Sequence, residues 1–336
     1  MLERHITICA ALAAGCGSSP PAPRLPVPPL ADTATHTVRR VEVATGVSLE
    51  VLDFGGTGTP IVLLAGLGNT AHVFDDFAPA LAVNHRVVGI TRRGFRSSTT
   101  TATGYDVATR AADDLAVLDA LHFERAILIG HSLAGDELTE LATTHGDRVI
   151  SLVYLDAAHD HAAIRAVLAT APKDLDRPPP RSAFASVTAF GQWIRAFVGF
   201  ELSRGELLAS LVLGPHGEVI DMRDRPITTQ RYMEGATAQD FTRVHAPALV
   251  LMAEWTEASH PGYRDLDAGS RARLHDWFPL MAAVGEATRA RVKRDLAGAR
   301  LVEVEHGHHY MFITERPVVL DAIRTFLEAT APHSQT

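Results

Sequence analysis

The pattern of apolar and polar residues begins with two segments in which they alternate, and it then changes to continuous apolar runs. Residues 37–44 and 48–54 alternate apolar and polar side chains around a Thr45-Gly46 turn, and this pattern predicts a β-hairpin. Continuous runs are typical of strands that are buried on both faces of a sheet. Such runs follow at 61–64, 87–90, 126–129, 152–155 and 248–252, and a further run at 301–304 is apolar except at Glu303.

Helix-forming segments lie between these runs, notably at 107–121 and 317–327. Strands that alternate with helices predict an α/β fold, in which helices cover a mostly parallel sheet. With 336 residues and 46% hydrophobic content, the chain is long enough to bury a large core of this kind.

A long insertion interrupts the alternation after the run at 152–155. Its length of about ninety residues exceeds what a single crossover helix requires. It holds Trp193, Phe197 and Phe200, together with an amphipathic stretch at 205–213. We interpret the three aromatic side chains as a small core of the insertion, with direct substrate contact as the alternative.

The first 36 residues do not follow the strand and helix pattern. Residues 1–16 combine a polar start with an apolar run that is too short to span a bilayer, and they end in small residues before Cys16. They resemble a bacterial lipoprotein signal, which implies export and a lipid anchor on Cys16; an ordinary secretory signal, giving a secreted or periplasmic protein, is the alternative. Residues 17–36 read as a flexible Pro/Ser-rich tether.

The net charge and the positions of the cysteines limit which partners and reactive groups are expected. The net charge of -8 is spread along the chain without a basic block, so neither nucleic acid nor an anionic membrane surface is expected as a partner. Both cysteines, Cys9 and Cys16, lie in the leader, so the folded part has no disulfide, thiol nucleophile or cysteine metal site. A small molecule is therefore the expected partner, and the oligomeric state stays open.

The most informative motif is Gly130-His131-Ser132-Leu133-Ala134-Gly135, which follows an apolar run and precedes a helix-forming stretch. A serine at the apex of a strand-turn-helix must take strained backbone angles and needs small neighbours. Such a turn holds the Ser132 hydroxyl out of the sheet as a nucleophile. An ordinary glycine-rich connection is the alternative interpretation.

This motif resembles the nucleophile elbow of the α/β-hydrolase family, G-x-S-x-G, with Ala134 in the last small position and Gly135 one place later. The resemblance implies an eight-stranded, mostly parallel sheet with helices on both faces. It divides the chain into a core at 37–158 and 246–330 and a helical cap at 159–245, inserted after the sixth strand.

The resemblance also implies an oxyanion hole. The segment Ala65-Gly66-Leu67-Gly68-Asn69 stands where the family usually has a His-Gly loop, with Ala65 in place of the histidine. Because backbone amides bind the oxyanion, the expected donors are the amides of Leu67 and Leu133. A plain turn between strand and helix is the alternative.

The family places its catalytic histidine in the loop after the last strand, where this chain has His306, His308 and His309. The residues that follow favour His309, with His308 as the alternative. Three clustered histidines could suggest a metal, but they lack acidic or cysteine partners, so neither a metal nor a cofactor is expected.

The catalytic acid departs from the common family pattern, because Thr256 stands where an Asp is usual after the seventh strand. In pancreatic-type lipases the acid instead follows the sixth strand, and in this chain that position is Asp156. An acid there can still orient the histidine. Glu254 and Glu257 are the alternatives.

The segment 91–98 resembles the family loop D-x-R-G-x-G-x-S after the fourth strand, and we expect Arg93 to brace loops rather than to bind substrate. The resemblance as a whole implies a serine hydrolase that cleaves carboxylic esters through an acyl-enzyme on Ser132. The nucleophile argues against dehalogenase and epoxide hydrolase chemistry, which uses Asp in this fold. Aminopeptidase, thioesterase, carbon-carbon bond hydrolase and haloperoxidase activities stay open, as does a binding protein without activity.

Overall fold

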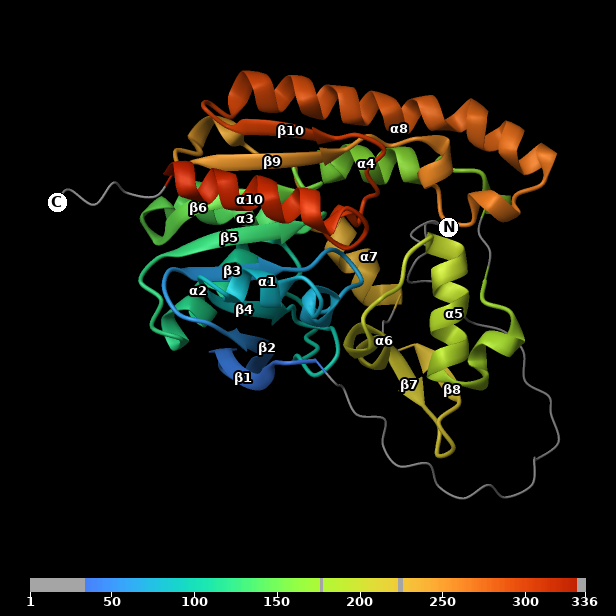
Figure 1. The fold of residues 1–336 in the computed structure, drawn as a ribbon, viewed down its shortest axis with the longest axis horizontal. Helices are drawn as coiled ribbons and strands as arrows, with labels where there is room; N and C mark the ends of the chain where they lie inside the picture. Colours follow the sequence, from blue (N-terminus) through green and yellow to red (C-terminus); the bar gives the residue numbers. More distant parts are fainter. Residues whose placement is uncertain (1–33, 176–177, 223–225, 331–336) are drawn as a thin grey trace.

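The fold is built on one sheet, and the computed structural model describes it within residues 34–175, 178–222 and 226–330. Eight strands lie in the order β1-β2-β4-β3-β5-β6-β9-β10 (Figure 1). The pairs from β4 to β10 are parallel, while β2 is antiparallel to both β1 and β4. The strands are β1 (Thr37–Ala44), β2 (Val47–Gly55), β3 (Pro60–Leu64), β4 (Arg86–Thr91), β5 (Ala126–His131), β6 (Val149–Leu155), β9 (Ala248–Ala253) and β10 (Arg300–Val304).

Helices cover both faces of this sheet, which confirms the predicted fold class. Successive residues of β3 belong to different cores: Ile61 and Leu63 to one, and Val62 and Leu64 to the other. This is why the strand is apolar throughout. One core includes α1 (Ala78–Ala82) and α10 (Arg316–Thr330), and the other includes α2 (Val107–Ala120), α3 (Ala134–Thr144) and the C-terminal part of α8 (Ala268–Asp295).

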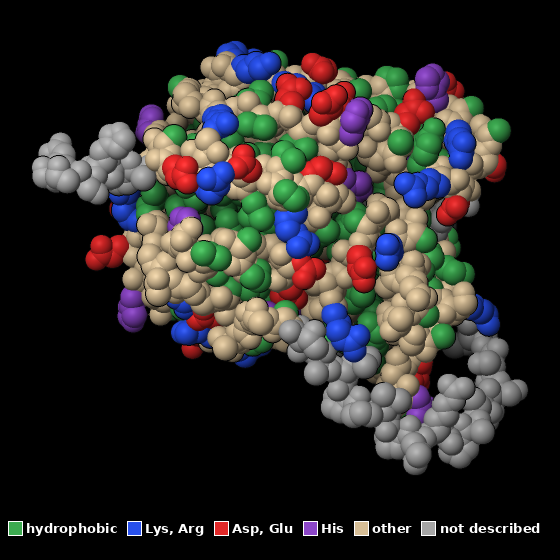
Figure 2. Space-filling model, in the orientation of Figure 1, with side chains coloured by type: hydrophobic (Ala, Val, Ile, Leu, Met, Phe, Trp, Pro, Cys, Tyr) green, Lys and Arg blue, Asp and Glu red, His purple; other side chains and the backbone are tan. Residues whose placement is uncertain are grey.

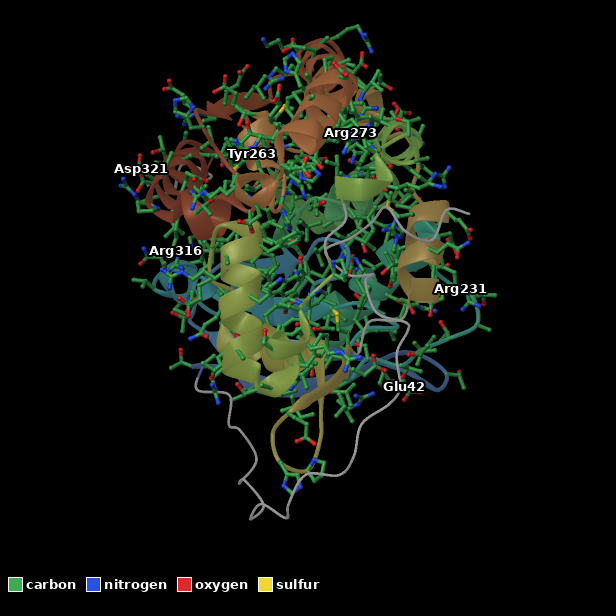
Figure 3. All side chains as sticks on the ribbon, turned by 90° about the vertical axis from the view of Figure 1, so that its right-hand side faces the viewer. Glu42, Arg231, Tyr263, Arg273, Arg316 and Asp321 are labelled. Carbon is green, nitrogen blue, oxygen red and sulfur yellow. The ribbon has the colours of Figure 1, made fainter. Side chains whose placement is uncertain are left out.

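The segment between β6 and β9 lies beyond the carboxyl ends of the parallel strands, on the right-hand side of Figure 1. Figure 3 looks at the same region from that side, with α5 and the β7–β8 hairpin in front. The predicted amphipathic stretch at 205–213 is a short helix followed by a strand. The elements are α4 (His161–Leu168), α5 (Val187–Val198), α6 (Arg204–Ser210), β7 (Leu211–Leu213), β8 (Val219–Met222) and α7 (Pro226–Glu234).

A buried carboxylate on α6 joins this insertion to the core. Glu206 is 1% exposed and accepts hydrogen bonds from the Asn69 side chain and from the Thr70 amide and hydroxyl. Burial raises the pKa of Glu206, although these donors oppose the shift. Asn69 in turn accepts a hydrogen bond from the Tyr310 hydroxyl, at 2.8 Å. The loop after β3 is therefore held from both the insertion and the loop after β10.

The predicted leader at 1–16, including Cys16, lies outside the described residues, as does most of the predicted tether at 17–36. The last tether residue is described: the His36 ring contacts Phe54 edge-on, and its Nδ1 lies 3.2 Å from Asp75 Oδ1. Within the described ranges, no helix combines the length and hydrophobicity needed to cross a membrane. On the face drawn in Figure 2, basic and acidic side chains are interspersed.

Candidate active site

Ser132 occupies a strained turn between β5 and α3. Its φ is +54°, a left-handed value that a serine rarely adopts, and its amide donates to the Leu155 carbonyl at 3.2 Å. Space is short at the glycines on both sides of it. A Cβ at Gly135 would lie 1.7 Å from the Ala157 oxygen, and one at Gly130 would lie 2.6 Å from Leu138. Gly130 thus allows the close approach of β5 and α3 that the sequence predicts, and Gly135 allows α3 to approach the segment after β6.

Three of the predicted side chains meet at the carboxyl ends of the strands. Ser132 Oγ lies 3.0 Å from His309 Nε2, and His309 Nδ1 lies 2.7 Å from Asp156 Oδ2. Since an ionised carboxylate can only accept, His309 donates from Nδ1 and its Nε2 is free to accept the Ser132 proton. Ser132 follows β5, Asp156 follows β6 and His309 follows β10, so neighbouring parts of the sheet edge supply all three.

Asp156 is fully buried, and both of its oxygens are saturated with donors. Besides His309, the carboxylate accepts hydrogen bonds from the Trp255 indole at 2.8 Å, the Ala253 amide at 3.0 Å and His159 Nε2 at 3.0 Å. Burial alone would raise the pKa of Asp156, but the His159 and His309 imidazoles hold it below its ordinary value. Asp156 therefore stays ionised although water does not reach it.

His131, the residue before the serine, fixes the backbone of the histidine loop. Its Nε2 donates to the His309 carbonyl at 2.9 Å, and its ring packs against the tilted ring of Tyr310 with the centroids 4.7 Å apart. Burial and the neighbouring His309 lower the pKa of His131 well below its usual value, so this ring is neutral. The turn between β5 and α3 thereby supplies Ser132 and also His131, which holds the backbone of His309.

The loop after β3 packs directly on the elbow. A Cβ at Gly66 would lie 2.6 Å from His131 Nδ1 and 3.2 Å from Ser132 Cβ, so only glycine allows this approach. Leu67 and Leu133 line the same cavity as Ser132, and neither backbone amide donates a hydrogen bond to another described residue. Two unpaired amides beside a nucleophile can bind an oxyanion.

A buried ion pair holds this loop in place. Arg92 is bidentate to Glu137 of α3, with both distances at 2.5 Å, and donates to the carbonyls of Ala65 and Gly66. Burial lowers the pKa of Arg92, but the Glu137 carboxylate outweighs this and raises it, so the guanidinium is charged. Arg93 makes a separate bidentate pair with Asp113 and braces the following loop.

Gly66→Ala is expected to lower kcat about a hundredfold while the protein stays folded, because the new methyl group displaces the loop that carries the Leu67 amide. Steady-state kinetics with a chromogenic ester measure the loss. Gly146→Ala is the matched control, since a Cβ there meets nothing within 4 Å. Equal kcat for the two variants would show that the loop after β3 does not stabilise the transition state.

The alternative residues do not hydrogen-bond to Ser132 or to its partners. His308 Nδ1 accepts a hydrogen bond from the Tyr310 amide, and burial lowers the pKa of His308 to about 4. Glu254 accepts from the His306 amide at 3.3 Å, and Glu257 lies 2.7 Å from His275. The structure thus brings Asp156 and His309 to Ser132 and places these three side chains in other contacts.

Stability is expected to fall as the pH drops from about 6.5 to 4, because buried neutral histidines take up protons only on unfolding. Burial lowers the pKa of His131, His159 and His308, so all three act in this direction. Each contributes at most about 1.4 kcal/mol per pH unit. Urea unfolding at stepped pH measures the slope. The slope of unfolding free energy against pH should be shallower in His308→Gln than in the parent. It should be the same as the parent's in the control His245→Gln, because His245 is exposed. Equal slopes in the two variants would contradict the role given to His308.

A cavity of about 340 Å³ opens beside Ser132. It lies between the insertion and the connection from β9 to β10, and its walls are mainly apolar. α8 contributes Trp277, Phe278 and Met281, which fall outside the range predicted as a cap. Of the insertion aromatics, Phe197 lines the cavity, while Phe200 packs against His308 and Tyr310. The sequence interpretation thus missed one wall of the cavity.

Among the described residues, one group has the composition of a metal site: the ligand atoms of His36, His72 and Asp75 lie within 4.8 Å of one another. Asp75 Oδ1 faces His36 at 3.2 Å and its Oδ2 faces His72 at 3.4 Å. None of the three lines the cavity. The carboxylate shared by two imidazoles anchors the segment before β1 to the turn at Ala71–Phe74.

Comparison with known proteins agrees with this architecture. A profile of the alpha/beta hydrolase fold family matches residues 59–315, which is most of the chain. The chain therefore belongs to the alpha/beta hydrolase fold family. The crystal structure of E-2-(acetamidomethylene)succinate hydrolase superposes with a TM-score of 0.64 at 19% identity, covering 87% of this chain and 99% of that one. At that identity the likeness shows the fold alone.

Curated relatives match over shorter stretches. Fluoroacetate dehalogenase from Burkholderia sp. is 33% identical over 107 residues, 30% of this chain and 35% of that protein. A 2-heptyl-3-hydroxy-4-quinolone dioxygenase from Rhodococcus erythropolis is 30% identical over 174 residues, 50% of this chain and 63% of that protein. The chain spans between 35% and 38% of the length of the first curated relatives it matches. Their names cover different reactions on one fold.

Proposed function

We propose that the protein is a serine hydrolase that cleaves carboxylic esters through an acyl-enzyme intermediate. The observation that carries the proposal is the continuous hydrogen-bonded series from Ser132 through His309 to the buried Asp156, with distances of 3.0 Å and 2.7 Å. A neutral imidazole that accepts from a serine and donates to a carboxylate is the arrangement that activates a hydroxyl nucleophile.

In the first half of the proposed reaction, Ser132 Oγ attacks the ester carbonyl carbon while His309 Nε2 takes its proton. The carbonyl oxygen gains negative charge and is bound by the amides of Leu67 and Leu133. Asp156 stabilises the imidazolium that forms. The C–O bond to the leaving alcohol then breaks, and His309 returns the proton to that alcohol. The acyl group remains on Ser132.

In the second half, water attacks the acyl-enzyme and His309 takes a proton from it. The oxyanion forms at the same two amides and collapses with release of Ser132, which regains its proton from His309. Water must reach the carbonyl carbon, and the half-open position of His309, with its side chain 33% exposed, is compatible with this. The overall products are a carboxylic acid and an alcohol.

Hydrolysis of 4-nitrophenyl esters of graded acyl length by the full purified chain tests the proposal. We expect turnover with a rapid first release of about one nitrophenol per protein wherever deacylation is the slower step. A folded protein that hydrolyses none of the esters would overturn the ester assignment.

A further inference from the structure

One of the histidines that line the cavity, His161, has no part in the proposed reaction. His161 is the first residue of α4, lines the cavity and is only 4% exposed. Its Nδ1 lies 2.8 Å from Asp136 Oδ1 on α3. Its Nε2 is buried and has no hydrogen-bond partner in the described part of the chain.

Asp136 sets the tautomer of this ring. The carboxylate is 2% exposed, accepts from the Gln239 amide at 3.1 Å and lies 3.5 Å from the Arg110 guanidinium. Burial would raise the pKa of Asp136, but His161 and Arg110 hold it below the ordinary value. Since the ionised carboxylate only accepts, the proton of a neutral His161 is on Nδ1.

In this neutral tautomer Nε2 carries a lone pair, and it points away from Asp136 because the two ring nitrogens lie on opposite sides of the imidazole. The neighbouring walls of the cavity, Ile164, Leu168 and Met233, offer no side-chain donor. An acceptor left unpaired in an apolar site is unfavourable, and a ligand that supplies a donor relieves this cost.

We propose that His161 determines substrate specificity by accepting a hydrogen bond from a hydroxyl group on the apolar body of the ester. This inference rests on the proposed function and narrows its substrate class. An acceptor fixed among mainly apolar walls favours a molecule that has an apolar body and a hydroxyl donor at the matching position. Analogues with a methyl group in place of the hydroxyl leave Nε2 unpaired and bind less well.

Matched ester pairs test the proposal on the full chain. The acyl side is tested with 4-nitrophenyl esters of 3- and 4-hydroxyphenylacetic acid against those of 3- and 4-methylphenylacetic acid. The alcohol side is tested with 2-(4-hydroxyphenyl)ethyl acetate against 2-(4-methylphenyl)ethyl acetate. In the parent, kcat/KM is expected to favour the hydroxyl member of at least one pair about tenfold.

His161→Phe keeps a planar ring without the acceptor and should bring that ratio to about one. His161→Gln places an amide oxygen near the position of Nε2 and should restore part of the preference. Ile164→Val, one turn further along α4, is the matched control: it changes the shape of the same wall, so both members of a pair shift together and the ratio stays. Melting temperatures identify a variant that fails to fold. In that case the hydroxyl-to-methyl ratio of kcat/KM in the parent and in the other His161 variant tests the inference.

The inference is overturned if the parent hydrolyses both members of every pair equally, or if His161→Phe keeps the hydroxyl preference. These outcomes leave the proposed function intact, because the esters are still cleaved. A parent that cleaves no ester and forms no covalent adduct with a fluorophosphonate overturns the proposed function, and this inference with it.

Discussion

Replacing Ser132 with alanine is expected to lower ester turnover by about a millionfold while the protein stays folded. The hydroxyl is the only group at the elbow apex that can form the acyl bond, and His309 Nε2, 3.0 Å away, then has no proton to accept. The residual rate comes from the oxyanion amides and from binding alone. Steady-state kinetics and a melting curve measure the two effects separately.

A second serine variant serves as the control. Ser48→Ala removes a hydroxyl from β2, outside the walls of the cavity, and is expected to keep the parent kcat. If Ser132→Ala retained more than about a hundredth of the parent kcat, the nucleophile would have to be another group or a water molecule.

Asp156→Asn is expected to lower kcat about ten-thousandfold, the second largest effect. The carboxylate accepts four hydrogen bonds, whereas an asparagine amide must turn one NH2 group toward donors that already point at it. His309 then loses the partner that keeps its proton on Nδ1, and the imidazolium loses its counter-charge. The pH profile of kcat/KM reports the change together with the rate.

Two conservative variants test the competing positions for the acid. Glu254→Gln and Thr256→Ala are each expected to lower kcat less than about tenfold, since neither group contacts His309. A larger loss in Glu254→Gln than in Asp156→Asn would move the acid to the loop after β9.

The inner strands were predictable because each has a run of consecutive apolar residues, a pattern that a parallel sheet covered on both faces imposes. β1 begins and ends at the predicted residues, Thr37 and Ala44, since an antiparallel edge strand shows its alternation directly. α8 escaped prediction. Its buried residues include Leu274 and Trp277 near the cavity and Val292 against the sheet, so no single apolar stripe runs along its 28 residues.

The site could be predicted only as far as its residues carry local signals. Ser132 lies in a recognisable turn. Asp156 directly follows β6, and His309 lies in the loop after β10. His159, Trp255 and His131 gave no such signal, because their roles come from contacts between segments that are distant in sequence. The Trp255 indole reaches Asp156 across 99 positions, and His131 reaches the His309 carbonyl across 178. His159, three residues after Asp156, was the one spacing that could have suggested a support for the acid.

Intact-mass analysis after reaction with a fluorophosphonate tests the central claim most directly. The account predicts a single phosphonyl adduct on the parent and none on Ser132→Ala, because only a serine activated by His309 attacks the phosphorus and displaces fluoride. A folded parent that forms no adduct, or an adduct that persists in Ser132→Ala, would contradict it.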